Sequence, residues 1–453
     1  MANPQELLRS RGYVGLLVMA AIIGVPVSAA AYGFLALVDY LQKEIFTHLP
    51  HGLGFQAEPV WWPLPVLALG GLLTALAIRY LPGRGGPSPA GGFKMHGAPA
   101  IAELPGVVLA ALATLVFGTV LGPEMPLILL GGGLALLFLR LARRDVPERA
   151  RSVVGAAGSF AAISTLMGSP ILGAFLLMEA SGLGGPMLEV VLLPGLLAAG
   201  VGTLIFVGLD AWTGLGTFSL AIPDLPHFSR PDAAEFGWAV LIGAAAPFVG
   251  WGIRWLARRL HVIAERRPLL VLPLAGLAVA GLAIGYAEAT GKGSDQVLFS
   301  GQSALGPLVQ NSATYTVWAL LALIACKAVA YGISLGSFRG GPIFPALFIG
   351  AAGGIALSHL PGLPLVPAVA MGLGAMSVVM LTLPLTSVLL ATILLFSDGL
   401  AVTPLVIVAV VVAYVVAARI APADSEDSDA SSSPAPPVRA EPGTAKDKQP
   451  EPG

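Results

Sequence analysis

The sequence predicts an all-α, polytopic integral membrane protein with inverted repeats and re-entrant, tilted helices. Of the 453 residues, 56% are hydrophobic and 11% are charged, and the mean hydropathy is +0.84. Charged residues normally make up about a quarter of a soluble domain, so this composition argues against a soluble protein. A Gly/Pro break in front of an apolar segment also recurs in both halves of the chain.

Apolar runs follow one another along most of the chain. They cover residues 13–41, 62–80, 106–121, 125–141, 153–179, 187–209, 236–256, 269–287, 315–335, 343–360, 366–396 and 402–417. A helix needs about 20 residues to cross a bilayer, and these runs include matching, shorter and longer ones. The mixture of lengths predicts helices that are tilted or that enter the membrane without crossing it.

Positive charge gathers at two places between the apolar runs. The first predicted basic loop holds Arg140, Arg143, Arg144, Arg149 and Arg151, and the second holds Arg254, Arg258, Arg259, Arg266 and Arg267. The positive-inside rule puts both loops and the N-terminus in the cytoplasm, as expected for a multi-pass plasma membrane protein. The apolar flanks of both loops argue against a nucleic-acid partner.

Composition divides the chain into four predicted parts. Residues 1–210 are a first membrane repeat, 211–235 an extracytoplasmic loop, and 236–421 a second membrane repeat. Residues 422–453 are rich in Ser, Pro, Ala and acidic residues, which is typical of a disordered segment. We expect this tail, like the N-terminus, to lie in the cytoplasm.

Several classes of protein are disfavoured by what the sequence lacks. The apolar stretch after Arg9 and Arg11 is too long for a signal-peptide core, so we expect it to be the first crossing. Cys326 is the single cysteine, which excludes an intrachain disulfide. There is no H-E-x-x-H zinc motif and no G-x-S-x-G nucleophile motif, so neither an enzyme nor a cofactor is predicted.

The repeated break has the same frame in both halves. Residues 122–126 read Gly-Pro-Glu-Met-Pro and residues 341–345 read Gly-Pro-Ile-Phe-Pro, and each opens an apolar segment. A second break follows each frame, at Pro170 and at Pro384. Paired broken helices in two repeats point to a binding site near the bilayer midplane, on a pseudo-two-fold axis between the repeats.

The chemistry of such a site favours an anion. A helix N-terminus inside the membrane presents unpaired N–H groups and the positive end of the helix dipole. Candidate donors are the backbone N–H groups of Met125, Ile343 and Phe344, which can replace part of the water shell of an anion. Glu124 could occupy the same site as a gate that protonation releases. The alternative is an acidic first-turn residue that only caps its helix.

These residues resemble the CLC family of chloride channels and proton-coupled chloride antiporters over most of residues 14–420. Residues 340–350 are similar to the family segment G-G-x-F-x-P-x-L-x-x-G, and residues 122–126 to G-K/R-E-G-P. Residues 169–173, which run into Glu179, are similar to its A-P-L-A-G helix. The resemblance implies a homodimer with one pore per subunit. It also implies that chloride or another small inorganic anion, and protons, are the partners, with Glu124 as the external proton acceptor.

Ile343, Pro123 and Met125 depart from the family pattern, and two further departures bear on the mechanism. Where the family has G-S-G-I-P, residues 83–87 read Gly-Arg-Gly-Gly-Pro, so Arg84 replaces the anion-contacting serine beside Gly85 and Gly86. Arg84 could attract or hold anions at the inner mouth, or it could extend to the membrane surface without touching the path. Ala180 occupies the position of the internal proton-transferring acid. This change favours a channel-like or weakly proton-coupled mechanism.

The function predicted from the sequence is therefore a chloride-type channel or transporter with a glutamate gate. Strict chloride/proton antiport and secondary transport of another anion are the alternatives. Lys327 could supply positive potential near the path, or it could bury its stem and keep its head in water.

Overall fold

The computed structural model describes residues 8–420 except 96, 143–146, 183–185, 214–220, 224 and 396–397. The tail predicted at 422–453 and two arginines of the first basic loop, Arg143 and Arg144, lie outside the described residues. Within the described ranges the regular secondary structure is helical, and the only β feature is an isolated antiparallel bridge between Gly122 and Gly341. The predicted all-α class is confirmed.

The helices of the first half are α2 (Arg11–Lys43), α3 (Leu49–Gly52), α4 (Pro63–Tyr80), α5 (Leu104–Leu115), α6 (Glu124–Leu141), α7 (Glu148–Met167), α8 (Pro170–Ser181) and α9 (Pro186–Thr213). Those of the second half are α10 (Ala233–Arg266), α11 (Pro268–Thr290), α12 (Gln302–Gln310), α13 (Val317–Ser337), α14 (Ile343–Leu357), α15 (Leu365–Leu381), α16 (Pro384–Leu394) and α17 (Gly399–Ile420). Proline occupies the first turn of α4, α5, α8, α11 and α16, where its missing N–H leaves no hydrogen bond unmade.

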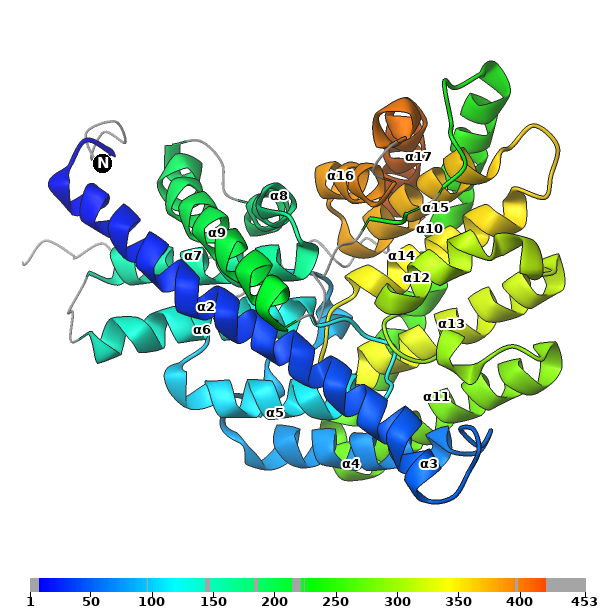
Figure 1. Ribbon diagram of the computed structural model, residues 1–453, viewed down its shortest axis with the longest axis horizontal. Helices are drawn as coiled ribbons and strands as arrows, with labels where there is room; N and C mark the ends of the chain where they lie inside the picture. The colour runs from blue at the N-terminus through cyan, green and yellow to red at the C-terminus, as the bar shows by residue number, and fades with distance from the viewer. Residues whose placement is uncertain are drawn as a thin grey trace, which may run out of the picture.

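The lengths of the helices confirm a polytopic membrane protein. Among the described residues, nine helical segments are long and apolar enough to cross a membrane, and several apolar helices of 10–17 residues are too short to do so. Figure 1 shows the long helix α2 running obliquely across the other first-half helices. The predicted mixture of tilted and re-entrant helices is therefore present.

Two details of the predicted segments are wrong. The apolar run expected to end at residue 121 stops being helical after Leu115, because the chain turns there toward the bridged Gly122. Neither basic cluster is confined to a loop. Arg254, Arg258 and Arg259 lie inside α10, and of the first cluster Arg140 lies in α6 and Arg151 in α7. Arginine is a good helix former, and its long side chain lets the helix continue past the apolar span.

The two halves repeat the same packing pattern. In the first half α6 packs on α7, α7 on α8 and α9, and α2 on α7 and α9. In the second half α14 packs on α15, α15 on α16 and α17, and α10 on α15 and α17. Figure 1 shows α6–α9 on the left of the view and α14–α17 on its upper right.

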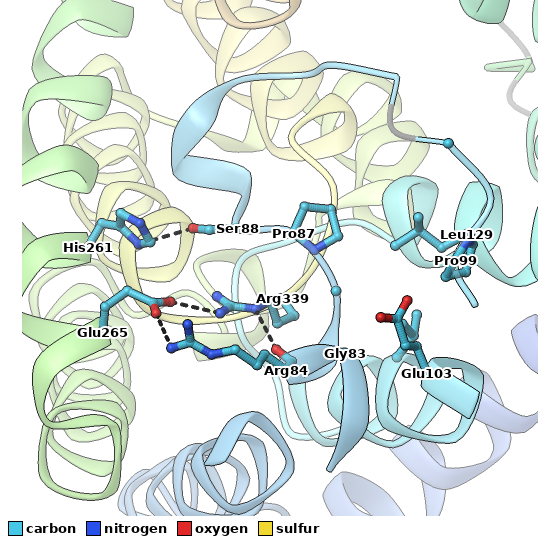
Figure 2. Close-up of a pocket in the computed structure, with 13 residues that line it drawn as sticks. Gly83, Arg84, Pro87, Ser88, Pro99, Glu103, Leu129, His261, Glu265 and Arg339 are labelled. Carbon is cyan, nitrogen blue, oxygen red and sulfur yellow. Dashed lines mark hydrogen bonds and ion pairs between the residues drawn. The ribbon is translucent and has the colours of Figure 1, made fainter. Parts of the chain in front are cut away.

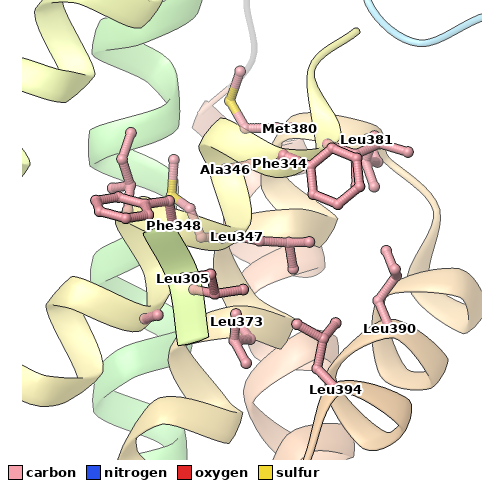
Figure 3. Close-up of a cluster of buried hydrophobic side chains, with 14 of the residues drawn as sticks. Leu305, Phe344, Ala346, Leu347, Phe348, Leu373, Met380, Leu381, Leu390 and Leu394 are labelled. Atoms are coloured by element: carbon pink, nitrogen blue, oxygen red, sulfur yellow. The ribbon is translucent and has the colours of Figure 1, made fainter. Parts of the chain in front are cut away.

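The core is densest around α14 and α15. Every residue from Val366 to Leu381 is buried, as is every residue from Ile343 to Ala352. Figure 3 shows Phe344, Leu347 and Phe348 of α14 packed among leucines of the surrounding helices. A helix that is apolar on all sides must be surrounded by other helices, so the N-terminus of α14 lies deep within the protein.

Candidate functional site

The two Gly-Pro frames meet each other directly. Gly122 N–H donates to the carbonyl oxygen of Gly341 at 2.8 Å, and Gly341 N–H donates back to the carbonyl of Gly122 at 2.6 Å. The helices that follow begin at Glu124 and at Ile343. The fold thus brings together the two helix N-termini that the sequence marks as equivalent.

Helix α13 holds both frames in place. The hydroxyl of the fully buried Tyr331 donates to the carbonyl oxygen of Pro342 at 2.7 Å. The backbone N–H of Val120 donates to Ser334 Oγ at 3.2 Å. One rigid helix therefore positions the residues that precede α6 and α14.

Glu124 lies at the centre of this arrangement. Its side chain is 0% exposed, and its Oε1 accepts a hydrogen bond from the backbone N–H of Phe344 at 3.1 Å. Its Oε2 is buried without a hydrogen-bond partner among the described residues. The carboxylate thus lies on the first turn of α14, the helix of the opposite repeat.

Glycine at both frames makes room for this carboxylate. A Cβ added to Gly122 or to Gly341 would collide with the carboxylate oxygens of Glu124. The predicted donors at Met125, Ile343 and Phe344 all lie in the first turns of α6 and α14, and all three residues are buried. Since Glu124 already occupies the N–H of Phe344, an anion must displace it to use that donor.

Lys327 lies on α13 with its ammonium group inside the protein. Its side chain is fully buried, and Nζ donates to the carbonyl oxygens of Gln296, Val297, Leu298 and Phe299 at 2.8–3.4 Å. The expectation that its head lies in water is wrong. Four carbonyl oxygens solvate the ammonium instead, so Lys327 fixes the loop between α11 and α12.

Glu179 binds a second helix N-terminus. Its Oε1 accepts from the N–H of Leu385 at 2.9 Å, and its Oε2 accepts from the N–H and the hydroxyl of Thr386 at 2.7 and 2.6 Å. These donors belong to the first turn of α16, so Glu179 connects α8 to the equivalent helix of the second half. Its carboxylate is fully engaged beside Ala180.

Two of the predicted inner residues, Arg84 and Gly86, line a separate cavity of about 500 Å³, whereas Gly85 is not part of its lining. Arg84 adopts φ 49° and ψ 33°, a left-handed conformation that is uncommon for a residue with a Cβ. Gly85 and Gly86 follow with φ of 73° and 89°. This tight turn aims the Arg84 side chain at Glu265 of α10, and Nη2 of Arg84 lies 2.5 Å from Oε2 of Glu265 (Figure 2).

The sequence did not single out two charged residues of this cavity. Arg339 is 6% exposed at its side chain, and its Nη2 lies 3.0 Å from Oε1 of Glu265. Its position directly before the Gly340-Gly341 pair was a usable signal, because a charged residue beside a membrane break is costly without a partner. Glu265 was hidden as the single acid among the arginines near the end of α10.

We also considered a metal-binding site in the described part of the chain. No three His, Cys, Asp or Glu side chains gather there in a way that could hold a metal ion. The first turns of α6 and α14 present backbone N–H groups, which are hydrogen-bond donors.

Comparison with known proteins places these features in a family context. A family model described as voltage gated chloride channel matches residues 66–418. The chain is also 30% identical over 368 residues to proteins called YfeO, described as candidate ion-transport proteins, from Shigella boydii serotype 4 and Escherichia coli O1:K1. In both cases the match covers 79% of this chain and 82% of the relative.

Solved structures share the fold. A slow cyanobacterial Cl⁻/H⁺ antiporter is similar with a TM-score of 0.72 and 18% identity, over 89% of this chain and 94% of the other. A CLC-type fluoride/proton antiporter is similar with a TM-score of 0.65 and 21% identity, over 89% and 95%. At these identities the likeness concerns the arrangement of helices.

Proposed function

Because this chain belongs to the voltage gated chloride channel family, we propose that it is a membrane anion pathway gated by the carboxylate of Glu124. In its ionised form Glu124 occupies the N-terminus of α14 and competes with a free anion for the N–H of Phe344. Protonation removes the charge that holds it there, so the side chain leaves and an anion enters. Met125 and Ile343 supply neighbouring backbone donors.

The observation that carries this proposal is the incomplete solvation of a fully buried carboxylate. Glu124 has one hydrogen bond from Phe344, and its second oxygen has no partner among the residues described. An acid in the membrane interior is costly and normally serves a function. A pathway for anions needs binding that is favourable but weak enough for release, and helix N-termini provide partial charges of that kind.

A channel-like or weakly proton-coupled mechanism is favoured. Ala180 cannot carry a proton, and the neighbouring acid Glu179 accepts three hydrogen bonds that hold it on α16. Strict chloride/proton antiport is the second candidate, since two proteins of similar fold are anion/proton antiporters. Secondary transport of another anion would use the same gate.

We further propose a homodimer in the plasma membrane with both termini in the cytoplasm. The arginines near the end of α10 and of α6 would then face the cytoplasm, as the positive-inside rule requires. The first membrane repeat would cover residues 1–210 and the second 236–421, and the inner cavity around Arg84 would open to the cytoplasmic side.

A liposome assay tests this function directly. Purified protein is reconstituted in chloride-loaded vesicles, and chloride efflux and proton movement are recorded in the same sample. We expect chloride efflux well above that of protein-free vesicles, with little accompanying proton movement. Uphill proton transport driven by a chloride gradient would favour strict antiport, and the absence of flux for chloride, fluoride and nitrate would contradict the proposal.

A further inference from the structure

The inner cavity contains a second carboxylate that occupies an anion-binding position. The cavity is lined by Arg84 and its neighbours, by Glu265 and His261 of α10, and by Arg339. Figure 2 shows the Glu265 carboxylate facing the two guanidinium groups, with one oxygen directed to each. This arrangement lies on different residues from the Glu124 site.

The geometry around Glu265 matches the recognition of a small planar oxyanion. Oε2 contacts Nη2 of Arg84 at 2.5 Å and Oε1 contacts Nη2 of Arg339 at 3.0 Å. Nε of Arg339 also donates to the carbonyl oxygen of Arg84 at 3.4 Å, which ties the two arginines together. Guanidinium groups present N–H donors in a rigid plane that suits the oxygens of a carboxylate or of an oxyanion of the same shape.

The three side chains differ in their freedom to move. Arg339 is 6% exposed and is held by its surroundings, whereas the side chains of Arg84 and Glu265 are 65% and 30% exposed. Two permanent positive charges face one negative charge, so removal of Glu265 leaves a doubly cationic pair on the cavity wall. Because Glu265 is partly exposed, its side chain can swing out when a free anion takes its place, while the buried Arg339 stays fixed.

We propose that Arg84 and Arg339 form an inner site for a small planar oxyanion, with nitrate as the model ligand, and that Glu265 is its built-in competitor. This inference deepens the proposed function, because it adds an anion site on the inner side of the same protein. An anion that enters from this side first displaces Glu265. The match to the family motif G-S-G-I-P points only to Arg84 as a residue of the inner cavity. The structure adds Arg339 and Glu265.

Nitrate binding to the full-length protein, measured by titration calorimetry, tests the inference without requiring transport. Glu265→Gln removes the competing charge and keeps the side-chain size, so we expect the nitrate Kd to fall at least several-fold. The matched control is Glu103→Gln, since Glu103 lines the same cavity and bonds the N–H of Ala100 without touching either arginine. We expect this control to change the nitrate Kd by less than twofold.

A second variant keeps the test decisive if Glu265→Gln fails to fold with Arg339 unpaired. The largely exposed Arg84 can be replaced with little loss of stability, and Arg84→Gln should weaken nitrate binding several-fold. Unchanged nitrate affinity in the folded variants, or an equal gain in Glu265→Gln and Glu103→Gln, would overturn the inference. An equal gain for chloride would overturn the assignment to planar oxyanions. A protein that binds nitrate in a Glu265-dependent way but supports no flux would contradict the proposed function alone.

Discussion

Glu124 and Glu179 are both carboxylates bound to the N-terminus of a helix in the opposite repeat, yet their surroundings differ. Glu179 is half-buried and accepts three hydrogen bonds, two of them from the backbone of Leu385 and Thr386. Glu124 is fully buried and accepts one hydrogen bond, from Phe344. The first carboxylate is fully satisfied, and the second is not.

This difference between the two carboxylates is our reason for proposing different roles for them. Three hydrogen bonds to an ionised group hold Glu179 firmly, since charge-assisted bonds are stronger than neutral ones. Glu124 gains less from its position and loses its hydration, so the free energy that separates its bound and released positions is smaller. The gate that we propose at Glu124 therefore differs from the helix cap at Glu179 in its number of donors and in its burial.

Among the variants that test this comparison, we expect Glu124→Gln to have the largest effect on anion flux. Wild-type anion flux should rise as external pH falls, by at most about tenfold per pH unit if one group titrates. The variant should conduct at least as fast as the protonated wild type and should lose the pH response, because its neutral side chain no longer competes as an anion does. Stopped-flow flux from liposomes at a series of external pH values measures both properties.

Glu58 supplies a matched control for this pH series. It lies outside the membrane-spanning helices, and burial together with the charge of Asp295 raises the pKa of Glu58 to about 7. Its titration therefore falls in the same experimental range. We expect Glu58→Gln to keep the pH response, and a response that vanishes in this variant but persists in Glu124→Gln would identify Glu124 as a cap.

An intermediate effect is expected from Gly341→Ala. The added methyl group would take the space of the Glu124 carboxylate, so the side chain must leave the N-terminus of α14. Flux at high external pH should rise several-fold toward the low-pH value. Gly353→Ala in the same helix is the control, because a Cβ there meets open space. Normal pH-dependent flux in Gly341→Ala would mean that the observed carboxylate position does not block the pathway.

The smallest effect on transport is expected from Glu179→Gln. An amide cannot accept hydrogen bonds at both ends, so at least one donor of the α16 turn loses its partner, at a cost of about 1 kcal/mol in stability. The apparent Tm in detergent should fall by a few degrees, while the pH dependence of flux stays as in the wild type. The exposed Glu189→Gln should leave the Tm unchanged. Loss of the pH response in Glu179→Gln would give this acid a role in proton transfer and would remove the contrast with Glu124.

The sequence predicted the class of fold because hydropathy and the repeated breaks are local signals. The meeting of residues 122–126 with residues 341–345 also followed from their shared frame, although only the structure shows that Glu124 reaches across to Phe344. The carbonyl cage of Lys327 and the pairing of Glu265 with Arg339 could not be predicted, because each joins segments that are far apart along the chain. From the sequence we assigned the arginines near the end of α10 to a loop, because we assumed that a helix ends where its apolar run gives way to charged residues.

The reciprocal bond between Gly122 and Gly341 has a mechanical consequence. If the two repeats are related by the predicted pseudo-two-fold axis, residues in equivalent positions can touch each other only close to that axis. When one half rotates against the other about that axis, each atom moves in proportion to its distance from the axis, so atoms at this point scarcely move. Rotation of the two halves about such an axis would therefore do little to move Glu124, the gate that we propose. A turn of the side chain itself requires no such rearrangement, and rotamer changes are much faster than domain motions.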